Sequence, residues 1–214
     1  DEAAWLVLWS LGLALDALEA RAQREVPADD AAKARALVER RIESRIPAAY
    51  LTHEAWLQNV PFYVDERTIV PRSFIAELLA DAENEGTLDA WLTDRTQRVL
   101  DLCTGNGSLA VIAAMAYPEI TVDACDISQD ALAVAHINVE RHALSARITL
   151  LQSDLFANVR GPYDLIVCNP PYVNAASIAL LPPEYRAEPA LALAGGSDGM
   201  GLVRRILADA PAQM

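Results

Sequence analysis

The stretch Asp101-Leu102-Cys103-Thr104-Gly105-Asn106-Gly107 decides the fold, because it joins one short apolar run to the start of another. Residues 99–102 predict a buried strand, and residues 108–116 predict a helix. Glycines between the two allow the backbone to turn tightly and to approach a ligand at the helix N-terminus. The third glycine of the dinucleotide-binding fingerprint is absent, so a plain strand-to-helix turn remains an alternative interpretation.

Strands and helices continue to alternate after this turn. Short apolar runs such as residues 164–168 are typical of strands that are buried on both faces. The alternation predicts an α/β fold with a Rossmann-like parallel sheet. Such sheets normally continue past a fourth strand, so we expect the terminal strands to be missing from this sequence. The predicted strands are 99–102, 120–125, 147–151 and 163–168, and the predicted helices are 108–116, 129–141 and 201–210.

The part of the chain before the turn has a different pattern of apolar and polar residues. Residues 1–52 predict a small helical domain, in which 3–15 form a buried helix and Asp29-Asp30 cap a second helix. Residues 53–72 carry aromatic and β-branched residues between prolines, which predicts a short hairpin linker. Residues 73–214 are then the catalytic domain, truncated at its C-terminal side, and begin with a helix over 73–83.

Composition restricts the partners. The chain has 214 residues and a formal net charge of −13, which argues against a stable complex with nucleic acid and suits a basic protein partner. Residues 3–15 are apolar but too few to cross a bilayer, so no membrane partner is predicted. The three cysteines lack a CxxC spacing, which predicts no metal site and no disulfide framework and favours the cytoplasm. The oligomeric state is left open.

Two acidic residues follow the next two predicted strands. Asp126 lies nineteen residues after Gly107, where a carboxylate can accept hydrogen bonds from both hydroxyls of a ribose. Asp154 follows the third strand, and a capping or solvated role is its alternative. Because ligands bind outside the carboxyl ends of parallel strands, we expect the turn and both carboxylates to meet in one crevice. A dinucleotide and a nucleoside-bearing methyl donor both fit this pattern.

The tetrapeptide Asn169-Pro170-Pro171-Tyr172, at the end of the fourth strand, distinguishes these two ligands. It resembles the motif of methyltransferases that act on a nitrogen conjugated to a π system, either an adenine amino group or a glutamine amide. The lone pair of such a nitrogen is delocalised, so the nitrogen is a poor nucleophile. The Asn169 side-chain oxygen and the Pro170 carbonyl can hold its two N–H groups and favour a tetrahedral nitrogen, while Tyr172 stacks on the planar group. The alternative is a proline turn that merely ends the strand.

With this motif in place, the sequence resembles the protein-glutamine N-methyltransferases over nearly its whole length. The stretch 62–73, FYVDERTIVPRS, is similar to the branch that modifies large-subunit ribosomal protein three, whereas the release-factor branch typically has Pro-Arg-Pro. Cys103 indicates the same branch, because glycine is usual there in the other. Residues 181–189 and the glycine-rich 195–199 are similar to the substrate-side loop of both branches.

The resemblance implies a class I S-adenosylmethionine-dependent methyltransferase sheet, S-adenosylmethionine as cofactor, and a large-subunit ribosomal protein as substrate, recognised by the N-terminal helices. It implies catalytic roles for Asn169, Pro170 and Tyr172. The implied cofactor-binding residues are Asp101, Thr104, Gly105, Gly107, Asp126, Ile127, Asp154, Leu155 and Asn169. The implied substrate-binding residues are Asn169, Pro170, Pro171, Tyr172 and Glu188. For Arg72 and Glu188, a surface ion pair or a contact that stabilises a loop is an equal alternative.

Three other functions remain open. The release-factor branch shares the tetrapeptide and the substrate-side loop. An adenine amino methyltransferase shares the tetrapeptide, but the acidic chain lacks a basic, aromatic-interleaved stretch that could hold a flipped base and its phosphates. A non-catalytic subunit that activates a partner would keep the fold, but such relatives usually lose the tetrapeptide, which is intact here.

Overall fold

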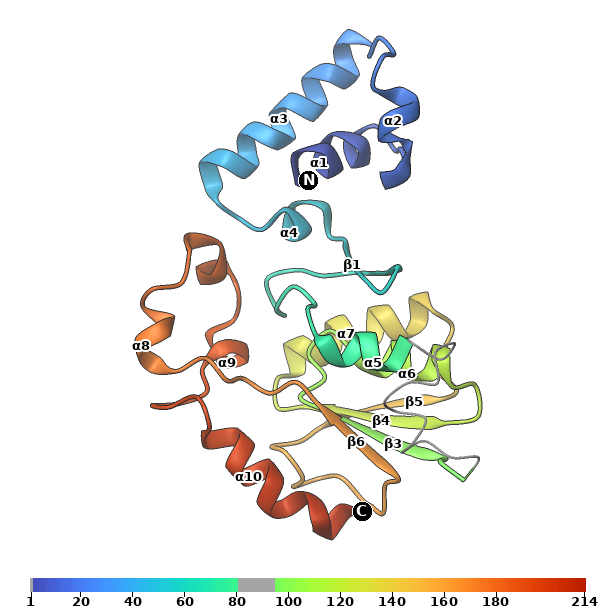
Figure 1. Cartoon of the computed structure of the whole chain (residues 1–214), viewed down its shortest axis with the longest axis vertical. Helices are drawn as coiled ribbons and strands as arrows, with labels where there is room; N and C mark the ends of the chain where they lie inside the picture. Colours follow the sequence, from blue (N-terminus) through green and yellow to red (C-terminus); the bar gives the residue numbers. More distant parts are fainter. Residues whose placement is uncertain (1, 81–94) are drawn as a thin grey trace.

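The computed structural model describes residues 2–80 and 95–214. Small helices at the N-terminus lie on one side of a two-stranded hairpin, and a sheet with helices on both faces lies on the other (Figure 1). None of the described helices is long and apolar enough to cross a membrane. The elements are α1 (Glu2–Ser10), η1 (Leu15–Ala17), α2 (Leu18–Arg21), α3 (Ala28–Ser44), α4 (Ala48–Thr52), β1 (Ala55–Leu57), β2 (Val60–Phe62), α5 (Phe74–Ala80), β3 (Arg98–Leu102), α6 (Ser108–Ala116), β4 (Thr121–Asp126), α7 (Gln129–Arg141), β5 (Ile148–Gln152), β6 (Leu165–Cys168), α8 (Ala175–Ile178), η2 (Pro183–Ala187), α9 (Ala190–Leu193), α10 (Gly201–Asp209) and η3 (Ala210–Gln213).

The main sheet confirms the predicted parallel α/β architecture. Its described strands are all parallel and lie in the order β5-β4-β3-β6. In the register, Leu102 pairs with Cys125 and with Cys168, so neighbouring strands end almost level with one another. The loops that follow these strands therefore meet at one edge of the sheet, where the sequence placed the glycine turn, Asp126 and the tetrapeptide.

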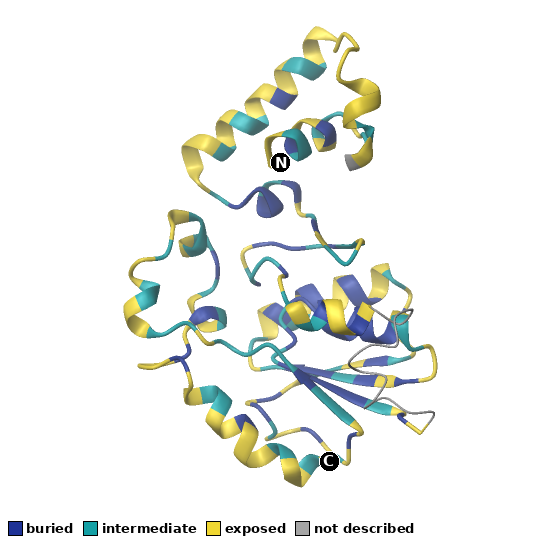
Figure 2. Ribbon diagram, viewed as in Figure 1, coloured by how far each residue is buried: buried dark blue, intermediate teal, exposed yellow. Residues whose placement is uncertain are grey.

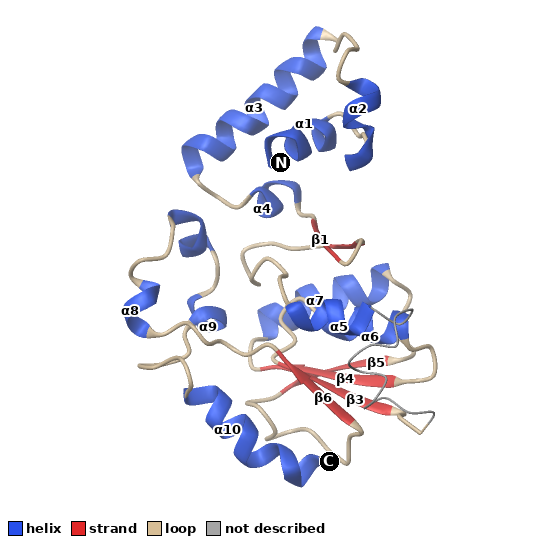
Figure 3. Ribbon diagram, viewed as in Figure 1, coloured by secondary structure: helices blue, strands red, loops and turns tan. Residues whose placement is uncertain are grey.

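Alternation along β3 divides the core of the sheet and its flanking helices, which we call the sheet domain, between the two faces of the sheet. Val99 packs with residues of α5, α6 and α7, whereas Leu100 and Leu102 pack on the opposite side with Ile206 of α10. Figure 3 shows α5, α6 and α7 on one face and α10 on the other. In Figure 2 β3 and α6 are largely buried, whereas most residues of β5 and β6 are intermediate or exposed. The helix α6 is covered because it carries apolar residues on every side and lies between the sheet and α5. Burial on both faces explains the continuous apolar run of β3. The prediction of a fully buried strand over 164–168 is wrong, because Asp164 is exposed and only Val167 of β6 is buried.

The hairpin of the linker is anchored to the sheet domain. Its two-residue turn, Gln58-Asn59, has positive φ at both positions (50° and 59°), as in the turns that match the twist of a short hairpin. Phe62 is fully buried in the core beside α6, and the Pro61 carbonyl lies 2.9 Å from the Nε2 atom of His142, at the end of α7. The linker therefore has a fixed position over the helices of the sheet domain.

The N-terminal helices differ from the sequence prediction in two respects. The helix expected over 3–15 ends at Ser10, because the chain turns at Gly12, whose φ is +64°. Only Leu6 and Leu8 of α1 are buried, so the helix is half-covered rather than enclosed. The predicted acidic cap is also wrong, because the N-cap of α3 is Pro27. The acidic pair lies in the first turn, where its negative charge interacts favourably with the positive end of the helix dipole.

Short helical segments between β6 and α10 were not predicted. They are α8, η2 and α9, each of five residues or fewer and therefore too short to show a periodic pattern. The side chain of Asn174 caps α8 by accepting a hydrogen bond from the Ser177 amide at 2.8 Å. At the start of the sheet domain, α5 occupies part of the helix predicted over 73–83, and residues 81–83 lie outside the described residues.

Candidate active site

A cavity of about 240 Å³ lies at the carboxyl edge of the sheet, and we call it the donor cavity. Gly105 and Asp126 line it after β3 and β4, and Asn169 lines it after β6. Ligands of parallel sheets bind at this edge. Predicted site residues that the structure brings together on this wall are Gly105, Asp126, Ile127, Asp154, Leu155, Asn169 and Pro171.

Asp126 is held in place by backbone donors. Its Oδ2 atom accepts the Gly105 N–H at 2.9 Å, and its Oδ1 atom accepts the Ser128 N–H at 2.9 Å. Burial raises the pKa of Asp126, although these backbone hydrogen bonds oppose the shift. A carboxylate oxygen can accept more than one hydrogen bond, so Asp126 keeps acceptor capacity on the side that faces the cavity. The geometry therefore suits a ligand with two neighbouring hydroxyl groups.

Three residues predicted to contact the cofactor, Asp101, Thr104 and Gly107, lie behind the turn and outside the wall of the donor cavity. Asp101 is fully buried and accepts hydrogen bonds from the Thr104 hydroxyl and from the Ala110 N–H. Burial raises the pKa of Asp101 to about 7, although these hydrogen bonds lower it. The structure shows these residues as supports of the turn, and their contact with a ligand stays a prediction.

Gly107 has a structural reason to be glycine. Its φ is +80°, and a Cβ at this position would lie 3.2 Å from the Cβ of Ala135 on α7. A side chain would therefore strain the backbone and push α7 away from the turn.

Asn138 of α7 is a fully buried polar residue that sequence reasoning missed. Its side-chain amide donates to the Asn106 carbonyl at 2.9 Å and to the Tyr63 carbonyl at 3.0 Å, and its oxygen accepts the Tyr63 N–H at 2.7 Å. It therefore fixes the linker directly over the glycine turn. One signal was present in the sequence: Asn138 occupies the same helix face as Ala131 and Ala135, where an apolar residue is expected.

A second cavity, of about 270 Å³, adjoins the first, and we call it the acceptor cavity. Its wall includes Arg72 of the linker, Pro170 and Tyr172 of the tetrapeptide, and Tyr185 of η2. Asn169 lines both cavities. The tetrapeptide is therefore shared between them, with Pro171 on the donor side and Pro170 and Tyr172 on the acceptor side.

Two acceptor atoms of this tetrapeptide are available to a ligand. The Asn169 Nδ2 atom lies 3.4 Å from the Arg72 carbonyl, to which it donates, so the Oδ1 atom is turned away from that carbonyl. Among the described residues, no donor reaches Asn169 Oδ1 or the Pro170 carbonyl. Two unoccupied acceptors on consecutive residues can bind the two N–H groups of a primary amide.

The glycine-rich stretch 195–199 supports Tyr172 from behind. A Cβ at Gly195 would lie 2.7 Å from the Tyr172 Cα atom, and a Cβ at Gly199 would collide with the Tyr172 carbonyl. Only glycines allow this backbone approach. The side chain of Tyr172 is 61% exposed, so it projects outward where an incoming planar group can stack on it.

Glu188 has a different place from the one predicted. Its carboxylate is buried and forms a two-point ion pair with the Arg72 guanidinium, in which Nη1 lies 2.9 Å from Oε1. It lines neither cavity. The guanidinium also lies 4.7 Å above the centre of the Tyr185 ring. Of the two alternatives, the pair is thus a loop-stabilising contact that joins the linker to the substrate-side loop, rather than a surface ion pair.

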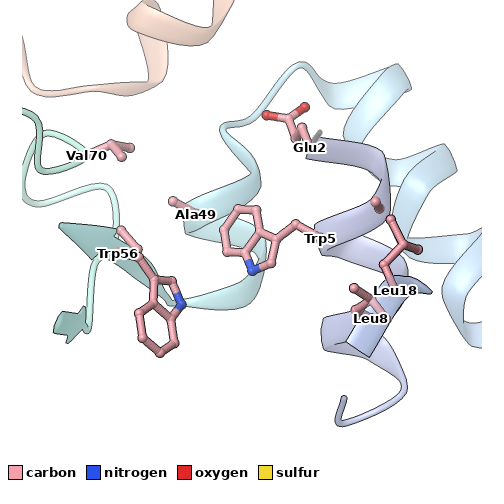
Figure 4. A pocket seen from close by; sticks show the side chains of 9 residues that line it. Glu2, Trp5, Leu8, Leu18, Ala49, Trp56 and Val70 are labelled. Carbon is pink, nitrogen blue, oxygen red and sulfur yellow. The ribbon is translucent and has the colours of Figure 1, made fainter. Parts of the chain in front are cut away.

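A hollow away from the sheet edge is lined by apolar side chains of the helical domain and the hairpin, among them Trp5, Trp56 and Val70 (Figure 4). The Trp56 Nε1 atom donates to Glu54 at 2.8 Å, and Glu2, at the other side, pairs with Arg41. No cluster of His, Cys, Asp and Glu that could hold a metal occurs anywhere in residues 2–80 and 95–214.

Comparisons with known proteins agree with this geometry. Residues 79–181 match the family model of the methyltransferase small domain. The ribosomal protein uL3 glutamine methyltransferase of Bordetella pertussis is 54% identical over 99% of the chain, and that of Burkholderia pseudomallei is 51% identical over 98%. The chain spans 70% of the length of each of these relatives. The crystal structure of the hMettl16 catalytic domain with the MAT2A 3′UTR hairpin 6 matches 86% of this chain and 63% of its own, with a TM-score of 0.51 and 15% identity, which shows a common fold alone.

Proposed function

We propose, from the premise that the chain belongs to the family of ribosomal protein uL3 glutamine methyltransferases, that it methylates the side-chain amide nitrogen of a glutamine in uL3. It is a methyltransferase with the Rossmann-like fold of the S-adenosylmethionine-dependent enzymes, and S-adenosylmethionine is its cofactor. The observation that carries the proposal is the position of Asn169, which lines both the donor cavity and the acceptor cavity.

The residues of the donor cavity fit this cofactor. The Asp126 carboxylate lines the cavity and can accept hydrogen bonds from the ribose hydroxyls, and Asp154, Leu155 and Ile127 line the same wall. A Cβ at Gly105 would meet no protein atom within 4 Å, so the turn leaves open space beside the cavity. S-adenosylmethionine, when bound, supplies an electrophilic methyl group on a positively charged sulfur.

The acceptor cavity explains how a weak nucleophile can react. Asn169 Oδ1 and the Pro170 carbonyl accept the two amide N–H groups of the glutamine, and the Tyr172 ring packs against its planar face. These hydrogen bonds become stronger as the nitrogen loses its conjugation and gains positive charge, so they favour the transition state over the ground state. No general base is required, because the alkylated nitrogen loses its proton readily to water.

A ribosomal protein suits the charge of this chain. Ribosomal proteins that contact RNA are basic, and the chain carries a formal net charge of −13, so long-range attraction would bring the two together. We place the reaction in the cytoplasm, because the three cysteines are free thiols and the proposed substrate is a ribosomal component.

The test is intact-mass analysis of purified uL3 and of a class I release factor after incubation with the chain and isotope-labelled S-adenosylmethionine. We expect uL3 to gain one labelled methyl group, which peptide fragmentation places on a glutamine. The Asn169→Ala variant is the matched control, which must leave uL3 unlabelled on the same time scale. Labelling of the release factor alone, or of RNA in a parallel reaction, would overturn the assignment of uL3.

A further inference from the structure

One basic side chain of the donor cavity has no role in the function proposed above. Arg67 belongs to the linker and lines the cavity together with Thr68, Ile69 and residues that follow the strands. The sequence-based interpretation assigned nothing to it. Its position, its orientation and its unused N–H donors together indicate a ligand.

The buried amide of Asn138 fixes the start of the segment that carries Arg67. Asn138 binds the Tyr63 backbone through two hydrogen bonds and the Asn106 carbonyl through a third. The linker is therefore fixed at the glycine turn, and Arg67 follows four residues later. Arg67, Gly105 and Asp126 line the same cavity, so a donor whose ribose is bound by Asp126 has its other groups within the cavity that Arg67 lines.

The orientation of the guanidinium is set by Asp65. The Asp65 carboxylate is buried and accepts Arg67 Nε at 2.9 Å, the Arg67 backbone N–H at 3.1 Å and the Tyr63 hydroxyl at 2.9 Å, while its second oxygen binds Nη2. Nη1 has no hydrogen-bond partner among the residues the structure describes. The hydrogen bond to Asp65 raises the pKa of Arg67, so the guanidinium keeps its charge. The Arg67 side chain is 35% exposed and can still reach a ligand.

The other basic residue on the cavity wall is held less firmly. Arg205 of α10 lies 3.3 Å from Asp154, and both side chains are more than half exposed. The methionine portion of the donor carries a carboxylate, and a carboxylate in a cavity requires a donor or a cation. Both arginines that line the cavity have a carboxylate partner, but only that of Arg67 is buried, so Arg67 can meet the ligand in a fixed orientation.

We propose that Arg67 binds the α-carboxylate of the methionine portion of S-adenosylmethionine through Nη1. The inference rests on the cofactor stated above. Asp65 acts as a positioning residue, because it fixes the guanidinium plane through Nε and Nη2 and leaves the remaining edge for the ligand. A charge-assisted hydrogen bond of this kind from a pre-oriented arginine adds affinity without ordering a flexible side chain.

Two ligands that differ in this group test the proposal by calorimetry. S-adenosylhomocysteine has the amino-acid carboxylate, whereas 5′-methylthioadenosine has the same nucleoside and thioether sulfur but lacks the whole amino-acid portion, its carboxylate and ammonium groups included. We expect Arg67→Met to weaken the binding of S-adenosylhomocysteine by about 10-fold to 100-fold, which corresponds to the loss of one hydrogen bond to a charged group. The affinity for 5′-methylthioadenosine should change less than about threefold. Arg204→Met is the matched control, because Arg204 pairs with Asp198 outside the cavity, and neither affinity should change.

The same measurements can overturn the proposal. Equal losses for both ligands would make Arg67 a structural residue of the linker, and unchanged binding of S-adenosylhomocysteine would remove it from the site. If Arg67→Met shows no cooperative thermal unfolding, Arg67→Gln, which keeps a polar group beside Asp65, is measured in its place with the same two outcomes. If the wild-type chain binds neither ligand, the cofactor itself is refuted. If the wild-type chain binds both ligands and the variant binds them equally well, only the role of Arg67 is refuted.

Discussion

Replacement of Asn169 by alanine should separate binding of the donor from chemistry. The change removes one of two adjacent acceptors, Asn169 Oδ1 and the Pro170 carbonyl, that are available to the substrate amide. Loss of one hydrogen bond that acts in the transition state slows the reaction by about 100-fold to 1,000-fold. The intramolecular hydrogen bond that the substitution removes is weak, because Nδ2 lies 3.4 Å from the Arg72 carbonyl, so stability should fall by less than about 1 kcal/mol.

The assay for this prediction is a single-turnover reaction with excess chain, labelled S-adenosylmethionine and uL3, combined with calorimetry of S-adenosylhomocysteine. Donor affinity should change less than about fivefold, because Asn169 supplies only part of the cavity wall. Asn174→Ala is the control: it removes the cap of α8 in the same loop and should cost about 1 kcal/mol of stability, while the rate at saturating substrate stays within a few-fold. A parallel loss of donor affinity and rate in Asn169→Ala, or a rate within about tenfold of wild type, would refute the role assigned to this side chain.

Three further predictions concern the site and its supports. Asp126→Ala should weaken the binding of S-adenosylhomocysteine by at least about tenfold. It should also lower the melting temperature, since the carboxylate binds the backbone of Gly105 and Ser128, and unchanged affinity in calorimetry would contradict the ribose assignment. Because burial raises the pKa of Asp101 from 3.8 to about 7, the folded state holds that proton more tightly, and this residue destabilises the fold as pH rises through that window. The stability of Asp101→Asn relative to wild type in urea unfolding should therefore increase by more than about 1 kcal/mol from the lower to the upper end of that window, and a constant difference would show that Asp101 does not titrate there. Glu184→Gln removes the ion pairs that η2 forms with Arg41 and Arg45 of the helical domain, at 3.2 Å and 2.7 Å, so KM for uL3 should rise while donor affinity stays the same; an unchanged KM at low salt would argue against a role of this contact in substrate binding.

The sheet domain was predictable because its signals are local. The bounds predicted for α6 and α7 agree with the structure, since each helix begins directly after a turn and carries a continuous or periodic apolar pattern. Strand ends were displaced by one or two residues, because an apolar run shows where a strand is buried but not where its hydrogen bonds stop. Convergence of the glycine turn, Asp126 and Asn169 followed from topology alone, since the carboxyl ends of parallel strands share one edge.

Residues that connect distant segments could not be placed in this way. Asn138 joins a helix to a linker 75 positions earlier in the chain, and Arg72 joins the linker to a residue 116 positions later. No spacing within the sequence indicates such pairs. Glu188 illustrates the difficulty: its motif suggested contact with the substrate, whereas its carboxylate is buried against Arg72. A charged residue in a substrate-side loop can equally well hold the loop, and only its partner decides between the two roles.

The linker is the element whose importance is least visible in the sequence. Within six residues it provides Arg67 to the donor cavity, Ile69 to both cavities, Val70 to the tryptophan-lined hollow, and the Arg72 carbonyl to Asn169. Because these residues follow one another so closely, an insertion or deletion of one residue in this segment would alter all of these walls together. Donor binding, orientation of Asn169 and the position of the helical domain should therefore respond jointly to an insertion or deletion in the linker, whereas a substitution that keeps the spacing should affect only the wall that its side chain lines. A Val70→Ala variant, which touches neither reacting cavity directly, is expected to leave the affinity for 5′-methylthioadenosine intact, since a cavity at Val70 relaxes toward the hollow rather than toward Asp126.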